Sequence, residues 1–352
     1  ELDDLSRFIM LSNPQLSPDS SKLAYVVTRI EGDVYYTTIW VVDSANGYPI
    51  RFYSGGNPVT PRWSPNGQQI LFTSRRDMEE DQKGVGIWTT QVWGGEPRLL
   101  AVADGGVVNP QWNMYGTKVY FLSDVGQENP DVKLIDKIPL WSDGRGFTYY
   151  KTRQLHVVDV ASGIISQLTD FEEGVNVFST SNQGDKIAYT RPIDTLKPNE
   201  HDLNILDITK AKHERILSGY NIQHICWSRE DKELAFQGKD LRSSDTHAYV
   251  YLHKMKDGEL VNLTESLDRG SERKHYYDLR SPYAGRPYPV WEGRELYFTV
   301  SDGASNPIYR ACVDHGNVDP IISGKFSVEE FDLRKDVIAY SRVSMCKPVE
   351  MW

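Results

Sequence analysis

The sequence is short of the residues that mark several classes of protein. Its three cysteines, Cys226, Cys312 and Cys346, are odd in number and far apart, which excludes a disulfide framework and favours a reducing compartment. No apolar run approaches the ~20 residues of a membrane span. The first residues, Glu1 to Asp4, show neither the basic nor the apolar region of a signal peptide. We therefore expect a cytoplasmic protein with no membrane partner.

Positive charge is also scarce. Lys and Arg total 39 against 49 Asp and Glu, so the formal net charge is −10. A nucleic-acid partner requires a basic face and an anionic membrane attracts basic segments, so this balance argues against both. The eight histidines show no metal-ligand spacing. His247 and His253 could share one strand face, but no acidic third ligand is near them, and we expect neither a metal site nor a cofactor.

What the sequence does contain is a repeated unit made of a polar tight turn, two spacer residues and an apolar, aromatic-rich strand. One copy is Ser64-Pro65-Asn66-Gly67 followed by Ile70-Leu71-Phe72-Thr73. Pro at the second turn position presets φ, Asn or Gly tolerates a positive φ, and β-branched and aromatic residues suit a half-buried strand. Five copies have this spacing, with strands that begin at Leu23, Ile70, Val119, Ile187 and Leu234, and two further strands, at Leu296 and Ile338, follow shorter turns.

The spacing of these strands predicts the fold class. Units of roughly 45 residues with four short antiparallel strands are typical of propeller blades. We expect an all-β protein, a seven-bladed β-propeller of four-stranded antiparallel blades that forms one domain over residues 1–352. The tryptophans that recur just before the turns, Trp63, Trp112 and Trp227, are interpreted as packing between blades and not as ligand-stacking platforms. The blades are expected at about residues 8–56, 57–106, 107–174, 175–220, 221–280, 281–325 and 326–352.

The two ends of the sequence predict how the ring closes. Blade one has four strands of its own: one before Ser17, then Leu23 to Thr28, Thr37 to Val42 and Ile50 to Tyr53. No N-terminal strand is left for the last blade, where Val349 to Trp352 begins a third strand and no fourth follows. We expect an open closure and an incomplete last blade, held by apolar packing alone and opening more readily than the other contacts. The unpaired strand edge indicates a possible homo-oligomer.

Four stretches are more specific than the repeats. They are Asp4-Leu5-Ser6-Arg7-Phe8 with Pro14-Gln15-Leu16-Ser17-Pro18-Asp19; Leu140-Trp141-Ser142-Asp143-Gly144-Arg145-Gly146 with Arg153-Gln154-Leu155-His156-Val157-Val158-Asp159; Gly163 with Gln167-Leu168-Thr169-Asp170; and Lys347-Pro348-Val349-Glu350-Met351. Together they resemble the propeller of the prolyl oligopeptidase family of serine peptidases, in its acylaminoacyl-peptidase branch. The resemblance implies a propeller that precedes an α/β-hydrolase domain carrying Ser, Asp and His. It also implies that the propeller lets only short or N-blocked peptides reach that domain.

The chain itself offers no candidate for the catalytic chemistry. The turn that exposes the nucleophile of such enzymes reads Gly-x-Ser-x-Gly, whereas Gly303-Ala304-Ser305-Asn306-Pro307 lacks the second Gly. We expect no catalytic residue in this chain, and an α/β-hydrolase domain of the same protein, expected after residue 352, as its partner beside peptide substrates. The alternative is a free-standing TolB-like propeller that scaffolds other proteins. A complete last blade and a secretory signal would favour that alternative.

Two long inserts interrupt the blade spacing, one within Asp124 to Thr152 and one near Arg269 to Arg286. Loops longer than about 12–15 residues in a compact array are often functional. Other branches of the family bind a free substrate N-terminus with propeller acids, which makes Glu128 a candidate. Asp143 and Arg145 lie in a Gly-flanked loop that can present charge, although a local ion pair is the alternative explanation. The candidate substrate-gating residues are Glu128, Asp143, Arg145 and Arg286.

Overall fold

The structure is a computed structural model that describes residues 7–43, 45, 47–79, 82–126, 131, 141–142, 146–147, 151–272 and 280–352. This part of the chain is all-β and contains no α-helix, as the sequence predicts. The strands are β1 (Met10–Leu16), β2 (Lys22–Glu31), β3 (Val34–Asp43), β4 (Pro49–Ser54), β5 (Val59–Trp63), β6 (Gln69–Ser74), β7 (Val85–Gln91), β8 (Arg98–Ala103), β9 (Val108–Trp112), β10 (Lys118–Val125), β11 (Trp141–Ser142), β12 (Gly146–Phe147), β13 (Thr152–Asp159), β14 (Ile165–Gln167), β15 (Phe178–Thr180), β16 (Lys186–Pro192), β17 (His201–Asp207), β18 (Lys212–Trp227), β19 (Glu233–Asp240), β20 (Tyr249–Lys254), β21 (Leu260–Asn262), β22 (Val290–Glu292), β23 (Glu295–Thr299), β24 (Ile308–Cys312), β25 (Val318–Ile322), β26 (Ser327–Arg334), β27 (Val337–Ser344) and β28 (Lys347–Met351).

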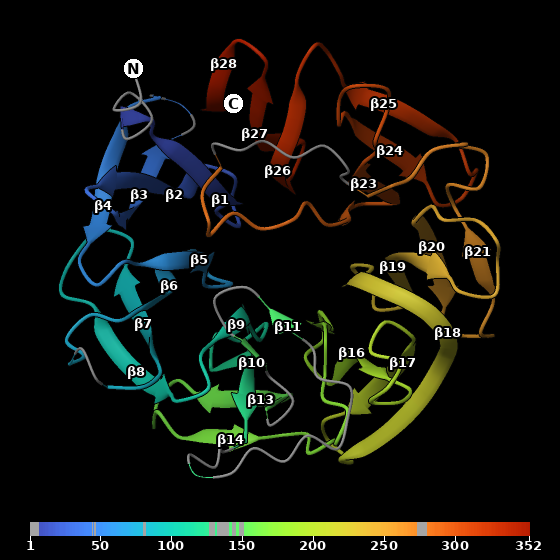
Figure 1. Ribbon diagram of the computed structural model, residues 1–352, viewed down its shortest axis with the longest axis horizontal. Coiled ribbons are helices and arrows are strands. Elements are labelled where there is room, and N and C mark those ends of the chain that lie inside the picture. Colours follow the sequence, from blue (N-terminus) through green and yellow to red (C-terminus); the bar gives the residue numbers. More distant parts are fainter. Residues whose placement is uncertain are drawn as a thin grey trace.

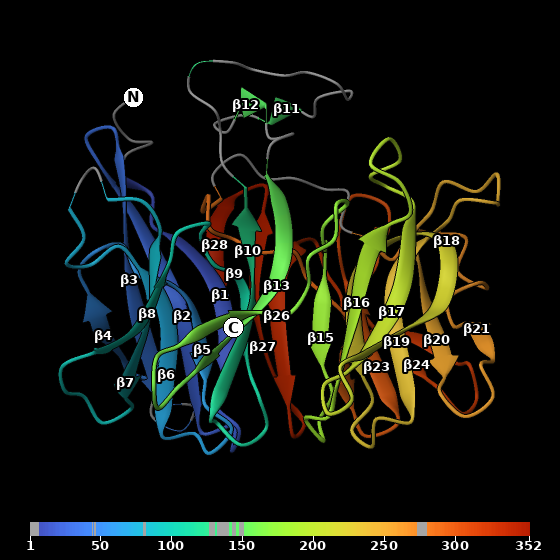
Figure 2. The ribbon, with the colours of Figure 1, turned by 90° about the horizontal axis from the view of Figure 1, so that it is seen from below.

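These strands form small antiparallel sheets that stand around a central axis, in the manner of a propeller (Figure 1). Four sheets have four strands each: β1–β4, β5–β8, β9-β10-β13-β14 and β22–β25. The β26–β28 sheet has three strands, β15–β21 form one seven-stranded sheet, and β11 pairs only with β12. Figure 2 shows the ring from the side, with β11 and β12 above one face.

The repeated turn has a common hydrogen-bond pattern that explains its sequence. In the copy at Ser64, the Gly67 N–H donates to the Ser64 carbonyl at 2.8 Å, and the Gln69 N–H donates to Ser64 Oγ at 2.9 Å. Gly67 has a φ of 69°, which glycine adopts without strain. The side-chain oxygen of the first turn residue accepts a bond from the N–H five positions later in all five copies, at Ser17, Ser64, Asn113, Ser181 and Ser228.

One strand departs from the expected blade boundaries. β18 is 16 residues long; its first half pairs with β17, its second half with β19, and Tyr220 lies opposite both His201 and Asp240. The expected boundary between residues 220 and 221 therefore falls inside a continuous strand. The physical reason is that the chain passes from pairing with β17 to pairing with β19 without a turn, next to Gly219, where φ is 85°.

The apolar core lies between neighbouring sheets. One buried cluster joins Leu71 of β6 to Val119 and Phe121 of β10, and comparable clusters join other neighbouring sheets. Another joins β17 to β19 within the seven-stranded sheet. The recurring tryptophans belong to these contacts, because each indole N–H donates to a carbonyl on the preceding inner strand, which is β1, β5 or β15. The pairs are Trp63 to Gln15 at 2.9 Å, Trp112 to Arg62 at 3.2 Å and Trp227 to Ser179 at 3.1 Å. The predicted packing role of these tryptophans is confirmed.

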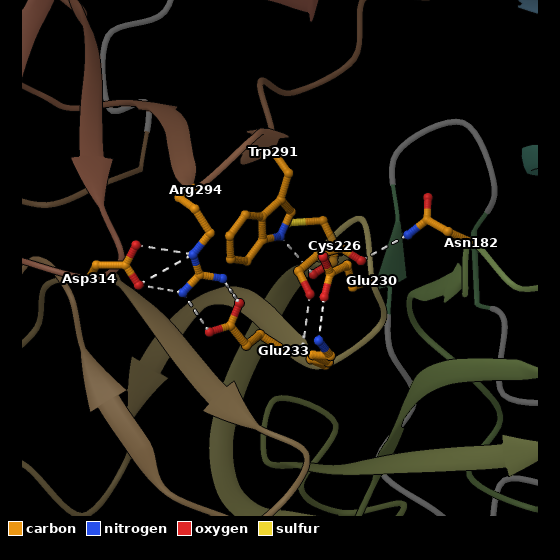
Figure 3. Close-up of polar contacts among 9 residues, drawn as sticks. Asn182, Cys226, Glu230, Glu233, Trp291, Arg294 and Asp314 are labelled. Carbon is orange, nitrogen blue, oxygen red and sulfur yellow. Dashed lines mark hydrogen bonds and ion pairs between the residues drawn. The ribbon is translucent and has the colours of Figure 1, made fainter.

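Polar contacts also join the β22–β25 sheet to β18 and β19 (Figure 3). Trp291 repeats the pattern by donating to the Cys226 carbonyl at 3.3 Å. Beside it, the Arg294 guanidinium lies between two carboxylates, donating to Glu233 Oε1 at 3.0 Å and to Asp314 Oδ1 at 2.7 Å. Arg294 therefore links its own sheet to the start of β19.

The contact between the β1–β4 sheet and the β26–β28 sheet, called the seam below, differs from the others. Among the described residues, no strand of one sheet pairs with a strand of the other. Apolar contact is present, because Ala339 and Met351 pack against the cluster of Leu16, Leu23 and Tyr25.

The expectation that apolar packing alone joins these two sheets is wrong. The Asn13 N–H donates to Glu330 Oε2 at 2.9 Å, and the Leu16 N–H donates to Asp332 Oδ2 at 2.7 Å. Glu330 and Asp332 are only 6% and 5% exposed, so these bonds lie away from water. Asn13 has a φ of 54° at a register shift in the β1–β2 pairing, and the shift frees its N–H from the ladder. Two buried carboxylates thus take the place of a shared strand.

Candidate functional site

The structure describes one of the four predicted gating residues. Glu128, Asp143 and Arg145 lie outside the described residues, so their predicted roles stay predictions. Arg286 has an exposed side chain and lies in the connection that leads into β22. Figure 1 shows this connection, in orange, passing from beside β1 along the inner side of β26 toward β23.

The first part of that connection, residues 280–285, is called the strap below because it touches both sides of the seam. Ser281 Oγ lies 2.9 Å from Thr28 Oγ1 on β2, and Asn13 Nδ2 donates to the Tyr283 carbonyl at 2.8 Å. The Gly285 N–H donates to Glu330 Oε1 at 2.7 Å. One Glu330 carboxylate therefore binds β1 with one oxygen and the strap with the other.

The strap leads into a polar and aromatic cluster made of Arg286, Tyr288 and His224. The rings of Tyr288 and His224, the latter on the inner half of β18, lie 6.0 Å apart. Burial, assisted by the charge of Arg286, lowers the pKa of His224 to about 4, so this imidazole is neutral near pH 7. Burial also raises the pKa of Tyr288, with Asp332 adding to the effect. The Tyr288 side chain is nevertheless 38% exposed, so it faces open space while protein surrounds its other sides.

This cluster can bind a ligand but offers no covalent chemistry. A neutral imidazole, a phenol and the Arg286 guanidinium can donate hydrogen bonds to peptide carbonyl or carboxylate oxygens. Among the described residues, no group of three or more His, Cys, Asp or Glu could hold a metal ion. Burial raises the pKa of the Cys226 thiol to about 12, which leaves it unreactive. No helix in the described part of the chain is long and apolar enough to cross a membrane.

Most of this cluster was not predicted from the sequence, where only Arg286 was selected from the second insert. Tyr288 follows the insert directly, and the run of aromatic residues around it was an available signal. His224 gave no such signal, because its proximity to Tyr288 depends on how the ring brings β18 and β22 together.

Comparisons with known proteins agree with the ring of sheets. No family model matches the chain. The uncharacterized peptidase YuxL of Bacillus subtilis is 26% identical over 361 residues, which cover 95% of this chain and 53% of YuxL. Pyrococcus horikoshii acylaminoacyl peptidase superimposes with a TM-score of 0.77 at 20% identity, over 98% of this chain and 51% of that one.

The chain is a propeller domain similar to that of acylaminoacyl peptidase. This finding confirms the resemblance seen in the sequence, and the chain is also distantly homologous to YuxL. The β-propeller domain of the trilobed protease of Pyrococcus furiosus superimposes with a TM-score of 0.70 at 19% identity, covering 98% of this chain and 94% of that domain. The propeller described here spans about half the length of the first two proteins.

Proposed function

We propose that this propeller is the substrate-selecting part of a serine peptidase that acts on short or N-blocked peptides. Its partner is an α/β-hydrolase domain of the same protein. The observation behind this proposal is that 98% of the chain superimposes on only 51% of acylaminoacyl peptidase. The rest of that protein lies outside the part that this chain matches. The chain has no Gly-x-Ser-x-Gly motif, so acyl transfer through a Ser-His-Asp triad has to be supplied by residues outside it. The low cysteine content and the exposed Cys346 favour the cytoplasm.

The ring that we propose has seven blades and an open closure. Counting the β15–β21 sheet as two blades that share β18 gives seven, of which β26–β28 is the blade with three strands. The trilobed protease propeller, which is described as having an open velcro topology, supports this arrangement by its likeness to the chain. An experimental structure with six or eight blades would contradict it.

We place the cluster of Arg286, Tyr288 and His224 beside the central opening of the ring, where it would take part in selection by size. A peptide that approaches along the axis meets the strap, the exposed Arg286 and the Tyr288 ring, and a folded protein is too wide to enter such a ring. The seam carboxylates support the same role, because a ring held closed by buried hydrogen bonds keeps its opening narrow.

We place the catalytic domain on the face of the ring that carries the tip of the β2–β3 hairpin. Val34, Tyr35 and Tyr36 at this tip are 49%, 42% and 44% exposed, and exposed apolar groups of this kind mark interaction sites. Figure 2 shows the tip rising on the same side as β11 and β12. Replacing Tyr35 and Tyr36 by Ser is expected to weaken association of the two domains. The matched control is Tyr48→Ser, because Tyr48 is 81% exposed at the opposite end of β3.

The decisive experiment compares the chain with the complete gene product. Both are assayed with N-acetylated and free peptide anilides, with a folded protein as substrate, and with a serine-directed fluorophosphonate label. The complete product is expected to be labelled, to cleave the short substrates and to spare the folded protein, whereas residues 1–352 alone are inactive. Turnover by residues 1–352 that the label blocks would refute the proposal. A complete product that ends near Trp352 and is not labelled would favour the TolB-like scaffold.

A further inference from the structure

A groove on the flank of the ring lies apart from the axis and the seam. It has a volume of about 440 Å³, within the ~300–1,000 Å³ of small-molecule sites. β16, β17 and the first half of β18 form its floor, and the connection between β14 and β15 forms one wall. We call it the flank groove. Its lining residues are Phe171, Tyr189, Arg191, Asp202, Asn204, His213 and Arg215.

Aromatic rings form one side of the flank groove. Phe171 stacks on Tyr189 with a centroid distance of 5.9 Å, and His213 meets both rings edge-on. His213 Nδ1 and the Tyr189 hydroxyl are hydrogen-bonded at 2.9 Å. Burial and the nearby Arg191 lower the pKa of His213, so the imidazole adds no charge near pH 7. The Arg191 guanidinium lies over the Phe171 ring at 4.8 Å, so a cation and an apolar wall meet at the same place.

Two charged groups in the groove have unused hydrogen-bonding capacity. Asp202 is 3% exposed and its Oδ1 has no hydrogen-bond partner, although Oδ2 lies 3.5 Å from Arg215 Nη1. Arg191 Nε also has no hydrogen-bond partner, because the nearest carboxylate oxygen, on Glu173, is 4.0 Å away. A buried polar atom without a partner costs about 1–3 kcal/mol. Both atoms are shielded from solvent, so an occupant that supplies a donor and an acceptor removes that cost once the Asp202 and Arg191 side chains turn toward it.

We infer that the flank groove binds a free α-amino acid with an apolar or aromatic side chain. The ammonium group donates to Asp202, the carboxylate accepts from Arg191 and Arg215, and the side chain packs against the aromatic side of the groove. An α-amino acid carries both charges on one carbon, which matches the close spacing of Asp202 and Arg215. The side chain of Arg215 is 65% exposed, so it can turn from Asp202 toward the ligand carboxylate while the ligand ammonium takes its place beside Asp202. The inference stands on this geometry and does not depend on the peptidase proposal.

The test uses L-phenylalanine as the probe, titrated into the chain by calorimetry and followed by NMR. N-acetyl-L-phenylalanine lacks the ammonium charge and L-phenylalaninamide lacks the carboxylate. Each is expected to bind at least about tenfold more weakly than L-phenylalanine, the change that corresponds to about 1.4 kcal/mol. Arg215→Gln is expected to weaken binding of L-phenylalanine to a similar degree while leaving that of the amide unchanged. Glu214→Gln, at an exposed neighbour on β18 outside the groove, is the control and should bind normally.

Asp202→Asn removes the anion, but Asp202 is buried, so its folding has to be checked by circular dichroism. The exposed Arg215 keeps the test decisive if that variant does not fold. Three results would overturn the inference. They are the absence of saturable binding up to about 10 mM L-phenylalanine, where millimolar ligands are largely bound; equal binding of both analogues; and Arg215→Gln binding that matches Glu214→Gln.

Discussion

Replacing Glu330 by Gln should loosen the seam, because this carboxylate joins three parts of the chain. It accepts one bond from the Asn13 N–H on β1 and one from the Gly285 N–H on the strap. Gln keeps one acceptor oxygen and places an NH₂ group against the other N–H. One buried donor then loses its partner, at about 1–3 kcal/mol, and the remaining bond loses its charge, at roughly 1 kcal/mol. The expected loss is about 2–4 kcal/mol at the seam.

The assay is amide hydrogen exchange under native conditions, because it detects local opening in addition to global unfolding. A loss of 2–4 kcal/mol corresponds to about 30- to 1,000-fold faster exchange at Asn13 and Gly285, at tenfold for each 1.4 kcal/mol. The amides of Tyr120 to Leu122, buried on β10 on the other side of the ring, should be unchanged. Glu214→Gln, at a side chain that is 67% exposed, is the matched control. If Asn13 and Gly285 exchange equally fast in the two variants, the carboxylate does not hold the seam.

Three further predictions follow from single contacts. Trp227→Phe should lower stability by about 1–3 kcal/mol in chemical denaturation, because it leaves a gap and an unpaired Ser179 carbonyl; an equal effect of Trp93→Phe, at a side chain 71% exposed, would contradict this. Burial raises the pKa of Asp332 above its ordinary value of 3.8, so its contribution to stability is greatest below pH 3.8 and declines as pH rises through the raised folded-state pKa. The Asp332→Asn variant cannot ionise at this position, so its melting temperature relative to that of the unchanged protein should be higher at pH 7 than at pH 4. A difference in melting temperature that does not vary with pH would refute the reasoning. Gly105→Ala should cost about 3 kcal/mol, because the added Cβ would lie 1.8 Å from the Asp124 carbonyl oxygen; it should exceed Gly47→Ala, where the space is open and only the positive φ opposes a side chain.

The sequence predicted the repeated part of the fold well, because the signals for it are local. Each repeat carries its own turn and its own strand, so Leu23, Ile187 and Ile338 could be assigned to strands without knowing what lies beside them. All three lie on strands that pair on both sides, β2, β16 and β27. The indole contacts followed from the same periodicity, since Trp63 and Trp227 occupy equivalent positions.

The contacts that join distant repeats could not be predicted in this way. Glu329-Glu330 and Asp332 read in the sequence as an ordinary charged strand, and only the ring brings Glu330 to Asn13 and Gly285. The flank groove has the same character, because Arg191, Asp202 and Arg215 lie on three adjacent strands and are each unremarkable alone. A repeated sequence pattern predicts individual strands. A site to which each strand contributes one residue produces no repeated pattern and therefore cannot be predicted in this way.

The position of the seam also dictates the order in which the protein can be assembled. Asn13 and Glu330 are separated by 317 residues, and closing a loop of that length costs about 5 kcal/mol of chain entropy. The individual sheets form from neighbouring hairpins and bear no such cost, so they can fold as they leave the ribosome. At about 5–20 residues per second, roughly 15–60 s separate the synthesis of β1 from that of β26. For all of that time β1 lacks its partners Glu330 and Asp332. The nascent protein is then an open arc in which the Asn13 and Leu16 amides of the first sheet are available to other hydrogen-bond acceptors.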